Sequence, residues 1–159
     1  GVDMNLLKNV IGTFTQPKAV FIINKFLQTL DKRQLISGFA EVIKHGLILD
    51  AAFFTQLQQL EPQQITPEII YQSIEIKNKV VNKDPLEKGL RKILNFGHTI
   101  GHAIESYSLA HEQSPLLHGE AVAIGLICES YLSHLQNGLS KDSLLNIQLQ
   151  FISISSVGC

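Results

Sequence analysis

Apolar residues recur at helical spacing through most of this chain after residue 31. Apolar positions three and four residues apart predict helices over residues 32–49, 51–60, 67–83, 88–106, 117–136 and 140–150. Three of these segments have clear boundary signals, which are Asp31 before the first, Thr66 and Pro67 at the third, and Gly138 after the fifth. Pro85 separates the third segment from the fourth. The pattern therefore predicts a mainly α domain.

The other segments have weaker patterns. Residues 1–16 lack a sustained apolar period, which predicts a loop or chain entry. Residues 19–23 form a short apolar run with β-branched side chains and predict a strand, although one strand cannot make a sheet. Residues 107–115 are predicted to form a loop, and residues 151–159 a tail after the last helix.

Composition and charge exclude several classes of protein. The chain has 159 residues, which suits one domain, and its 45% of apolar residues against 17% charged residues favours a packed core over disorder. A net charge of -1 predicts binding neither to nucleic acid nor to an anionic membrane. The apolar run at 121–128 is far shorter than the roughly 20 residues of a membrane span. Residues 1–5 do not resemble a secretion signal, and the two cysteines, Cys128 and Cys159, suit a reducing compartment, so a cytoplasmic protein is predicted.

A stripe of polar side chains interrupts the predicted helix at 88–106. Its members are spaced four, three, four and three residues apart, which places them along one helical face; they are Arg91, Asn95, His98, His102 and Glu105. Such a stripe either faces water or lines a cavity. Two histidines favour the cavity, because the exposed positions of this chain use Gln, Lys and Glu freely.

Histidine spacing suggests metal binding. His98 and His102 are four residues apart and can direct two imidazoles at one ion, although the glutamate of the zinc proteases is missing. His118 opens the next helix, where a helical hairpin would bring it back against the first two, or where it would be an end cap or a surface residue. The remaining histidines, His45, His111 and His134, are interpreted as structural or solvent-exposed.

Two charged residues interrupt apolar stripes. Glu41 lies within an apolar run, and a carboxylate there needs either an ion pair with Lys44, one turn later, or a bound cation. Lys77 interrupts the stripe of Ile70 and Ile74, either for a functional reason or with its ammonium at the edge of the core. The residues alone leave both alternatives open.

Three motifs carry a family resemblance. FAEVIKHG at 39–46, LNFGHTIGHA at 94–103 and LHGEAVA at 117–123 closely resemble the dehydroquinate synthases of the shikimate pathway, as do KNVIG at 8–12 and QP at 16–17. The resemblance runs in order over residues 1–138. It implies that residues 1–159 form the helical C-terminal domain of a two-domain α/β enzyme whose NAD-binding N-terminal half is absent, with residues 139–159 as a last helix and an unmatched tail.

The resemblance also implies an activity. The family uses NAD and a divalent metal, Zn2+ or Co2+, as a lyase that converts a deoxy-heptulosonate phosphate to dehydroquinate with phosphate release. By position, the resemblance implies that the metal ligands are Glu41, His98 and His118. It implies that the catalytic residues are Lys44, His102, Lys77, Arg91 and Asn95. It also implies that the substrate is contacted by Lys8, Asn9 and Glu87. The segment around Glu87 is expected to be an exposed loop. A homodimer is expected, and the chain without its N-terminal half is expected to be inactive.

Alternatives come from three classes. A related sugar phosphate cyclase would share the metal ligands, but Asn95 and His102 favour dehydroquinate synthase. An iron-type alcohol dehydrogenase would lack the LHGE motif at 117–120. A non-catalytic helical metal-binding or interaction module is the third alternative. Two departures from the family pattern are the missing N-terminal half with its glycine-rich NAD loop and the unmatched end at 151–159. The loop at 107–115 is also somewhat longer than in many members of the family.

Overall fold

The protein is mainly α, as predicted. The structure is a computed structural model that describes residues 2–4, 7–13, 15 and 17–156. Its α-helices are α1 (Lys32–Leu49), α2 (Ala51–Leu57), α3 (Pro67–Lys83), α4 (His98–His111), α5 (His118–Asn137) and α6 (Lys141–Ser156). Short 3-10 helices are η1 (Asn24–Thr29), η2 (Pro62–Gln64) and η3 (Leu90–Asn95), and the strands are β1 (Val2–Met4) and β2 (Leu7–Ile11). None of the helices in the described part combines the length and apolar character needed to cross a bilayer.

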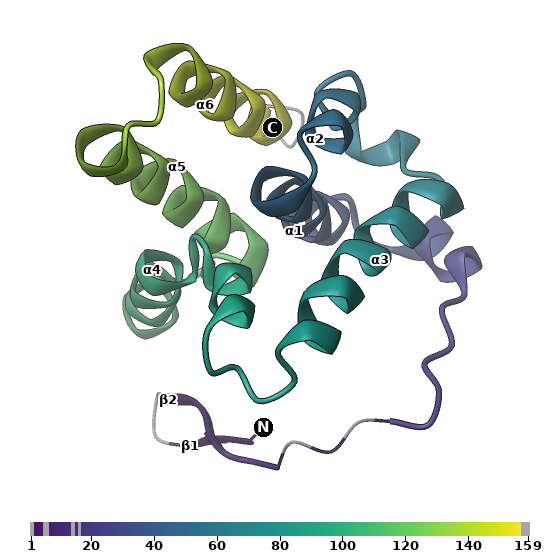
Figure 1. Cartoon of the computed structure of the whole chain (residues 1–159). Coiled ribbons are helices and arrows are strands. Elements are labelled where there is room, and N and C mark those ends of the chain that lie inside the picture. Colours follow the sequence, from purple (N-terminus) through teal and green to yellow (C-terminus); the bar gives the residue numbers. More distant parts are fainter. Residues whose placement is uncertain (1, 5–6, 14, 16, 157–159) are drawn as a thin grey trace.

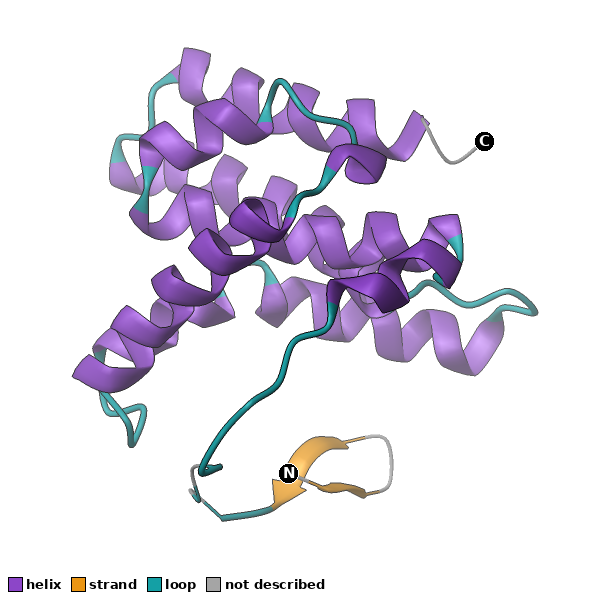
Figure 2. Cartoon of the chain, turned by 90° about the vertical axis from the view of Figure 1, so that its right-hand side faces the viewer, coloured by secondary structure: helices purple, strands orange, loops and turns teal. Residues whose placement is uncertain are grey.

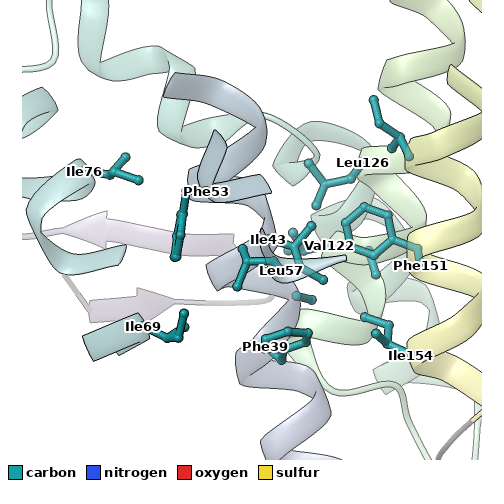
Figure 3. Close-up of a cluster of buried hydrophobic side chains, with 13 residues drawn as sticks. Phe39, Ile43, Phe53, Leu57, Ile69, Ile76, Val122, Leu126, Phe151 and Ile154 are labelled. Carbon is teal, nitrogen blue, oxygen red and sulfur yellow. The ribbon is translucent and has the colours of Figure 1, made fainter. Parts of the chain in front are cut away.

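Helix α1 lies at the centre of the helical bundle. It packs against α2, α3 and α5, while α4 and α6 both pack along α5 (Figure 1). The core lies where these helices meet, and its large, fully buried apolar side chains include Phe39, Ile43, Phe53, Leu57, Val122, Leu126 and Phe151 (Figure 3). This packing holds α1, α4 and the start of α5 side by side.

The predicted helix boundaries are confirmed where local capping decides them. Asp31 accepts a hydrogen bond from the backbone N–H of Arg33 at 2.9 Å, and α1 spans the predicted residues 32–49. Thr66 caps α3, which begins at Pro67 and ends at Lys83 as predicted. Gly138, with φ of +78°, ends α5 in the left-handed conformation that glycine adopts readily.

The N-terminal segment differs from the prediction. Residues expected to form a loop contain the antiparallel pair β1 and β2, in which Val2 pairs with Ile11 and Met4 with Leu7. Residues 19–23, predicted as a strand, are an extended segment joining this hairpin to the helices (Figure 2). The apolar run at 19–23 has no neighbouring strand within the described residues, and a strand is stable only when its backbone groups are paired.

The predicted helix at 88–106 is two elements. Residues 90–95 form η3, and α4 begins only at His98, after Gly97 with φ of +79°. The Glu129 carboxylate of α5 accepts a hydrogen bond from the Gly97 N–H at 2.8 Å and so caps the new helix. The polar stripe is therefore divided, with Arg91 and Asn95 on η3 and the other members on α4.

Both predicted C-terminal loop regions are shorter than expected. Helix α4 continues to His111, which leaves residues 112–117 to connect it to α5. Helix α6 extends to Ser156, and Phe151 and Ile154, both predicted to lie in a tail, are buried. Apolar burial against α1 and α5 therefore continues this helix through most of the segment.

Gly125 allows α4 and α5 to approach closely, and its replacement by alanine should destabilise the protein. A Cβ at this position would lie 1.9 Å from the Gly97 carbonyl oxygen and 2.8 Å from the Gly101 nitrogen, both of which are backbone atoms. We expect Gly125→Ala to lower the free energy of unfolding by about 3 kcal/mol or more, because overpacking forces the helices apart. Urea unfolding measures this loss. Gly38→Ala is the matched control, since a Cβ there meets nothing within 4 Å; equal stability of the two variants would contradict the prediction.

Candidate metal and substrate site

The candidate site lies where α1 meets η3, α4 and the last turns of α3. A pocket of about 200 Å³ opens there. It is lined by Glu41, Lys44, His45, Lys77, Glu87, Arg91, Leu94, Asn95 and His98. The fold thus gathers most of the residues singled out from the sequence around one cavity.

Three imidazoles cluster beside this pocket. His98 and His102 are one turn apart on α4, and His118 is the first residue of α5. Possible ligand atoms of the three side chains all lie within 4.8 Å of one another. Ring centroids are 5.3 Å apart for His98 and His102, 5.3 Å for His98 and His118, and 5.6 Å for His102 and His118. Of the alternatives considered for His118, the structure shows the one in which a helical hairpin brings it back against the first two histidines.

Glu41 uses its two carboxylate oxygens differently. Oε2 accepts a hydrogen bond from Lys44 Nζ at 2.7 Å, so the ion pair considered from the sequence is present. Oε1 is buried, has no hydrogen-bond donor, and lies 3.5 Å from His98 Nε2. One oxygen is thus bound to lysine while the other is directed at the imidazole cluster.

The residues present fit a divalent cation. A buried carboxylate oxygen without a donor is costly unless a positive charge lies against it. One carboxylate and two or three imidazoles are ligands typical of a catalytic zinc site, which keeps a coordination position for substrate. The three imidazoles lie close to one another, and His98 also lies close to Glu41, so the ligand set of Glu41, His98 and His118 stays a prediction.

The charge states of these groups suit metal binding. Burial alone would raise the pKa of Glu41, but the adjacent Lys44 ammonium outweighs burial, and the net pKa lies below its ordinary value. Burial lowers the pKa of His98, and Lys44 lowers it further. Near neutral pH, Glu41 is therefore ionised and His98 is neutral, as metal ligands must be. The side chain of Lys44 is only 3% exposed, and burial lowers its pKa against the opposing effect of Glu41.

The start of α5, which carries His118, is fixed by a partly exposed ion-pair network. Glu120 accepts hydrogen bonds from Arg33 Nε at 2.6 Å and from Arg33 Nη2 at 2.7 Å. The same carboxylate accepts the Leu117 N–H at 2.7 Å, and Arg33 also donates to the Pro115 carbonyl at 2.8 Å. This two-pronged arginine contact connects α1 to the residues just before His118.

A tight turn presents η3 to the pocket. The Asp84 carboxylate accepts backbone N–H groups of Arg91, Gly89 and Lys88 at 3.0, 2.7 and 2.9 Å, and these bonds lower its pKa. Arg91 Nη1 also donates to the Pro85 carbonyl at 3.0 Å. The turn therefore fixes the backbone from which the Arg91 side chain reaches the pocket.

Residues 85–88 form an exposed turn, as expected, but Glu87 itself is partly buried and lines the pocket. Its side chain is partly buried and accepts a hydrogen bond from Asn95 Nδ2 at 2.8 Å, with Arg91 Nε 3.9 Å away. Its φ of +57° is unusual for a residue with a Cβ. Lys77 lines the pocket from α3 and is exposed, in agreement with the edge-of-core alternative.

Two predicted substrate contacts cannot be placed. Lys8 and Asn9 belong to β2, but their side chains lie outside the described part of the structure. Their role stays a prediction.

His45 is the pocket residue that sequence reasoning missed. It was interpreted as lying on a surface-like position, yet it is 7% exposed, and its Nδ1 lies 2.7 Å from Ser73 Oγ. The available signal was its spacing: His45 is four residues after Glu41 and therefore shares its helical face. Of the other histidines left as structural or solvent-exposed, His111 stacks on Tyr107 at the surface and His134 contacts the Leu139 carbonyl at 2.6 Å.

Stability should fall in acid because of His45. Burial, with Lys44 nearby, lowers the pKa of His45 from 6.5 to about 4. Between these values the unfolded chain binds a proton that the folded protein excludes, so stability is complete above pH 6.5 and declines as the pH falls toward 4. The full loss is about 3 kcal/mol. Urea unfolding at several pH values should show a steeper decline for the wild type than for His45→Gln, and parallel declines would contradict the prediction.

Comparison with known proteins assigns the family. A model described as 3-dehydroquinate synthase C-terminal matches residues 38–155, and one described as 3-dehydroquinate synthase N-terminal matches residues 1–37. The junction lies within α1, and the C-terminal match extends beyond Gly138 through most of α6.

Curated relatives and a solved structure agree with these matches. The 3-dehydroquinate synthase of Parabacteroides distasonis is 42% identical over 151 residues, which are 92% of this chain and 42% of that protein. That of Streptococcus gordonii is 42% identical over 151 residues, 89% of this chain and 42% of that protein. The structure of ValA, a 2-epi-5-epi-valiolone synthase from Streptomyces hygroscopicus with NAD+ and Zn2+ bound, is 28% identical with a TM-score of 0.83, covering 97% of this chain and 44% of that one. The chain spans less than half the length of these proteins, and it belongs to the 3-dehydroquinate synthase family.

Proposed function

We propose that this chain is the metal- and substrate-binding part of a 3-dehydroquinate synthase, a lyase that converts a deoxy-heptulosonate phosphate to dehydroquinate with release of phosphate. The observation that carries the proposal is the buried Glu41 Oε1, which lacks a donor and faces His98 beside a cationic pocket. The family match and the Zn2+ in the ValA structure support a zinc site at these residues.

The proposed metal ligands are Glu41, His98 and His118. Zn2+ or Co2+ bound by them supplies Lewis-acid stabilisation to a substrate oxygen that loses its proton. Lys44 orients the carboxylate through Oε2, which leaves Oε1 to the ion. His102, one turn from His98 and not needed as a ligand, would hydrogen-bond the substrate or move a proton during phosphate elimination.

The cationic side of the pocket suits a doubly anionic substrate. Lys44, Lys77 and Arg91 all line it, and a sugar phosphate acid carries both a carboxylate and a phosphate for them to bind. Glu87 binds Asn95 and lies near Arg91, so it holds these two side chains in place rather than contacting the anion directly. The substrate is thus oriented by charges on α1, α3 and η3.

NAD would be bound by another part of the complete protein. The described residues contain no strand followed by a glycine-rich turn and a helix, the arrangement that binds a dinucleotide phosphate. NAD in the ValA structure supports its use by this family. A homodimer in the cytoplasm is part of the proposal and rests on the family resemblance.

A related sugar phosphate cyclase is the second candidate. The ValA structure matches this chain with a TM-score of 0.83, so the fold serves both activities. Identities of 42% to relatives named 3-dehydroquinate synthase, against 28% to ValA, favour the first candidate.

The test joins the chain to the segment that precedes the matching region in the Parabacteroides distasonis relative. We expect the purified chain alone to release no phosphate from the deoxy-heptulosonate phosphate, and the fusion to release it when NAD and Zn2+ are supplied. Product analysis should identify dehydroquinate. A fusion carrying Glu41→Gln is the control for a zinc-dependent reaction. Phosphate release by the chain alone, or a folded fusion that releases no phosphate from this substrate, would overturn the proposal.

A further inference from the structure

A buried carboxyl group lies behind the imidazole cluster, and the reaction proposed above does not use it. Glu105 is on α4, seven residues after His98 and on the same helical face, and its side chain is 8% exposed. Its Oε2 lies 3.0 Å from Nδ1 of His118, the first residue of α5. The pair therefore joins the two helices that carry the histidines.

We infer that Glu105 is a positioning residue, which holds the proton of His118 on Nδ1 and fixes the orientation of its ring. An ionised carboxylate only accepts hydrogen bonds, so the imidazole must donate through Nδ1. A neutral imidazole with Nδ1 protonated has its lone pair on Nε2. This nitrogen is then the one available to an ion, and the inference rests on the proposed function in taking His118 as a ligand.

The position of His118 in α5 does little to fix the orientation of its ring. Its side chain is 41% exposed and sits at the first position of a helix, where neighbouring turns restrict it little. Glu105, in contrast, is buried on α4, which packs closely on α5. The approach is so close that a Cβ added at Gly101 would lie only 3.0 Å from the Val122 Cα. The buried partner therefore fixes the exposed one.

Two separate contacts position His118. Arg33 and Glu120 fix the backbone before His118, whereas Glu105 fixes the ring itself. Partners of this kind, which bind the second nitrogen of a ligating histidine, typically contribute 10–100-fold to metal affinity. Removing the Glu105 carboxyl should therefore weaken zinc binding by roughly that factor without removing a ligand.

The first measurement needs no metal. Long-range ¹H–¹⁵N spectra of the metal-free chain, recorded at a pH where the imidazoles are neutral, report which nitrogen of His118 carries the proton. We expect Nδ1–H in the wild type, and mainly Nε2–H in Glu105→Ala, as in a free imidazole. Glu105→Gln should keep Nδ1–H, because the amide oxygen still accepts. Glu75→Gln, which removes a carboxylate from the exposed ion pair with Lys79, is the control and should match the wild type.

The second measurement is zinc affinity by competition with a chelator, with circular dichroism to verify folding. We expect Glu105→Ala to bind zinc 10–100-fold more weakly, and Glu105→Gln to recover much of the loss. An Nε2–H tautomer of His118 in the folded wild type, or Nδ1–H retained in Glu105→Ala, would overturn the inference. If the alanine variant does not fold, the wild-type and glutamine spectra decide. A changed tautomer with unchanged zinc affinity would instead overturn the ligand role of His118 in the proposed function.

Discussion

Replacing Glu41 is expected to reduce zinc affinity by on the order of 100-fold or more. Structural zinc sites with four ligands bind with about 10–16 kcal/mol, or roughly 3 kcal/mol per ligand. Glu41 Oε1 is buried without a donor, so a cation is the partner that this oxygen lacks. Isothermal titration calorimetry with Zn2+ on the wild type and on Glu41→Ala measures the effect.

The choice of substitution matters because Glu41 also pairs with Lys44. Alanine leaves a buried ammonium without its carboxylate, which typically costs about 3–5 kcal/mol of stability. Glu41→Gln keeps an acceptor for Lys44 and nearly the same volume, but it removes the negative charge that a divalent ion favours. We expect the glutamine variant to fold with a clearly weakened zinc affinity. Glu75→Gln again controls for loss of one acidic residue at an exposed position, and unchanged affinity in a folded Glu41→Ala protein would show that the ligand set is wrong.

Local signals explain the parts of the fold that could be predicted. Asp31 and Thr66 cap their own helices through atoms two and three residues away, so a reader of the sequence sees the complete interaction. The break before α4 is different, because the Gly97 N–H is bound by Glu129, 32 residues later. A strand also needs a paired neighbour. The apolar run at 19–23 has no such neighbour within the described residues, whereas β1 and β2 pair with each other.

The candidate site likewise contains residues that local spacing could predict and residues that only tertiary contacts reveal. The four-residue spacing placed His98 and His102 on one helical face, while the position of His118 was left open between a hairpin return and an end cap. The structure brings the three together. The two alternatives for Glu41, an ion pair or a cation site, could not be separated, because each of its oxygens has a different environment that only the packed structure reveals. His45 was missed because it is buried where α1 packs against α3, with its Nδ1 2.7 Å from Ser73 Oγ. Tertiary contacts, rather than residue type, therefore determine which polar groups become functional.

His98→Ala and His102→Ala should differ sharply although the two imidazoles are one turn apart and 5.3 Å from each other. His98 Nε2 lies 3.5 Å from Glu41 Oε1, so a metal bound by that carboxylate would have His98 as its neighbour. We expect His98→Ala to lose about 100-fold or more in zinc affinity, as for any lost ligand. His102→Ala should bind zinc within about threefold of the wild type, but slow turnover of the active fusion by roughly 10²–10⁴-fold, the usual contribution of a group that moves a proton.

The comparison decides between two ligand sets that share His98 and His118. If the ion is held by three imidazoles, as their mutual distances alone would allow, both alanine variants lose zinc and Glu41→Gln keeps it. If Glu41 completes the set, His102→Ala keeps its metal while Glu41→Gln and His98→Ala lose theirs. His111→Ala is the control, since that imidazole stacks on Tyr107 at the far end of α4. Zinc content after gel filtration and turnover of the fusion, measured on the same preparations, separate loss of the ion from loss of the proton-moving group. The buried Glu41 Oε1 favours the second set, because a carboxylate oxygen without a hydrogen-bond donor is costly to bury unless a positive charge lies against it. Either set of three protein ligands leaves one position for a substrate oxygen, and the second set gives His102 a role beside it.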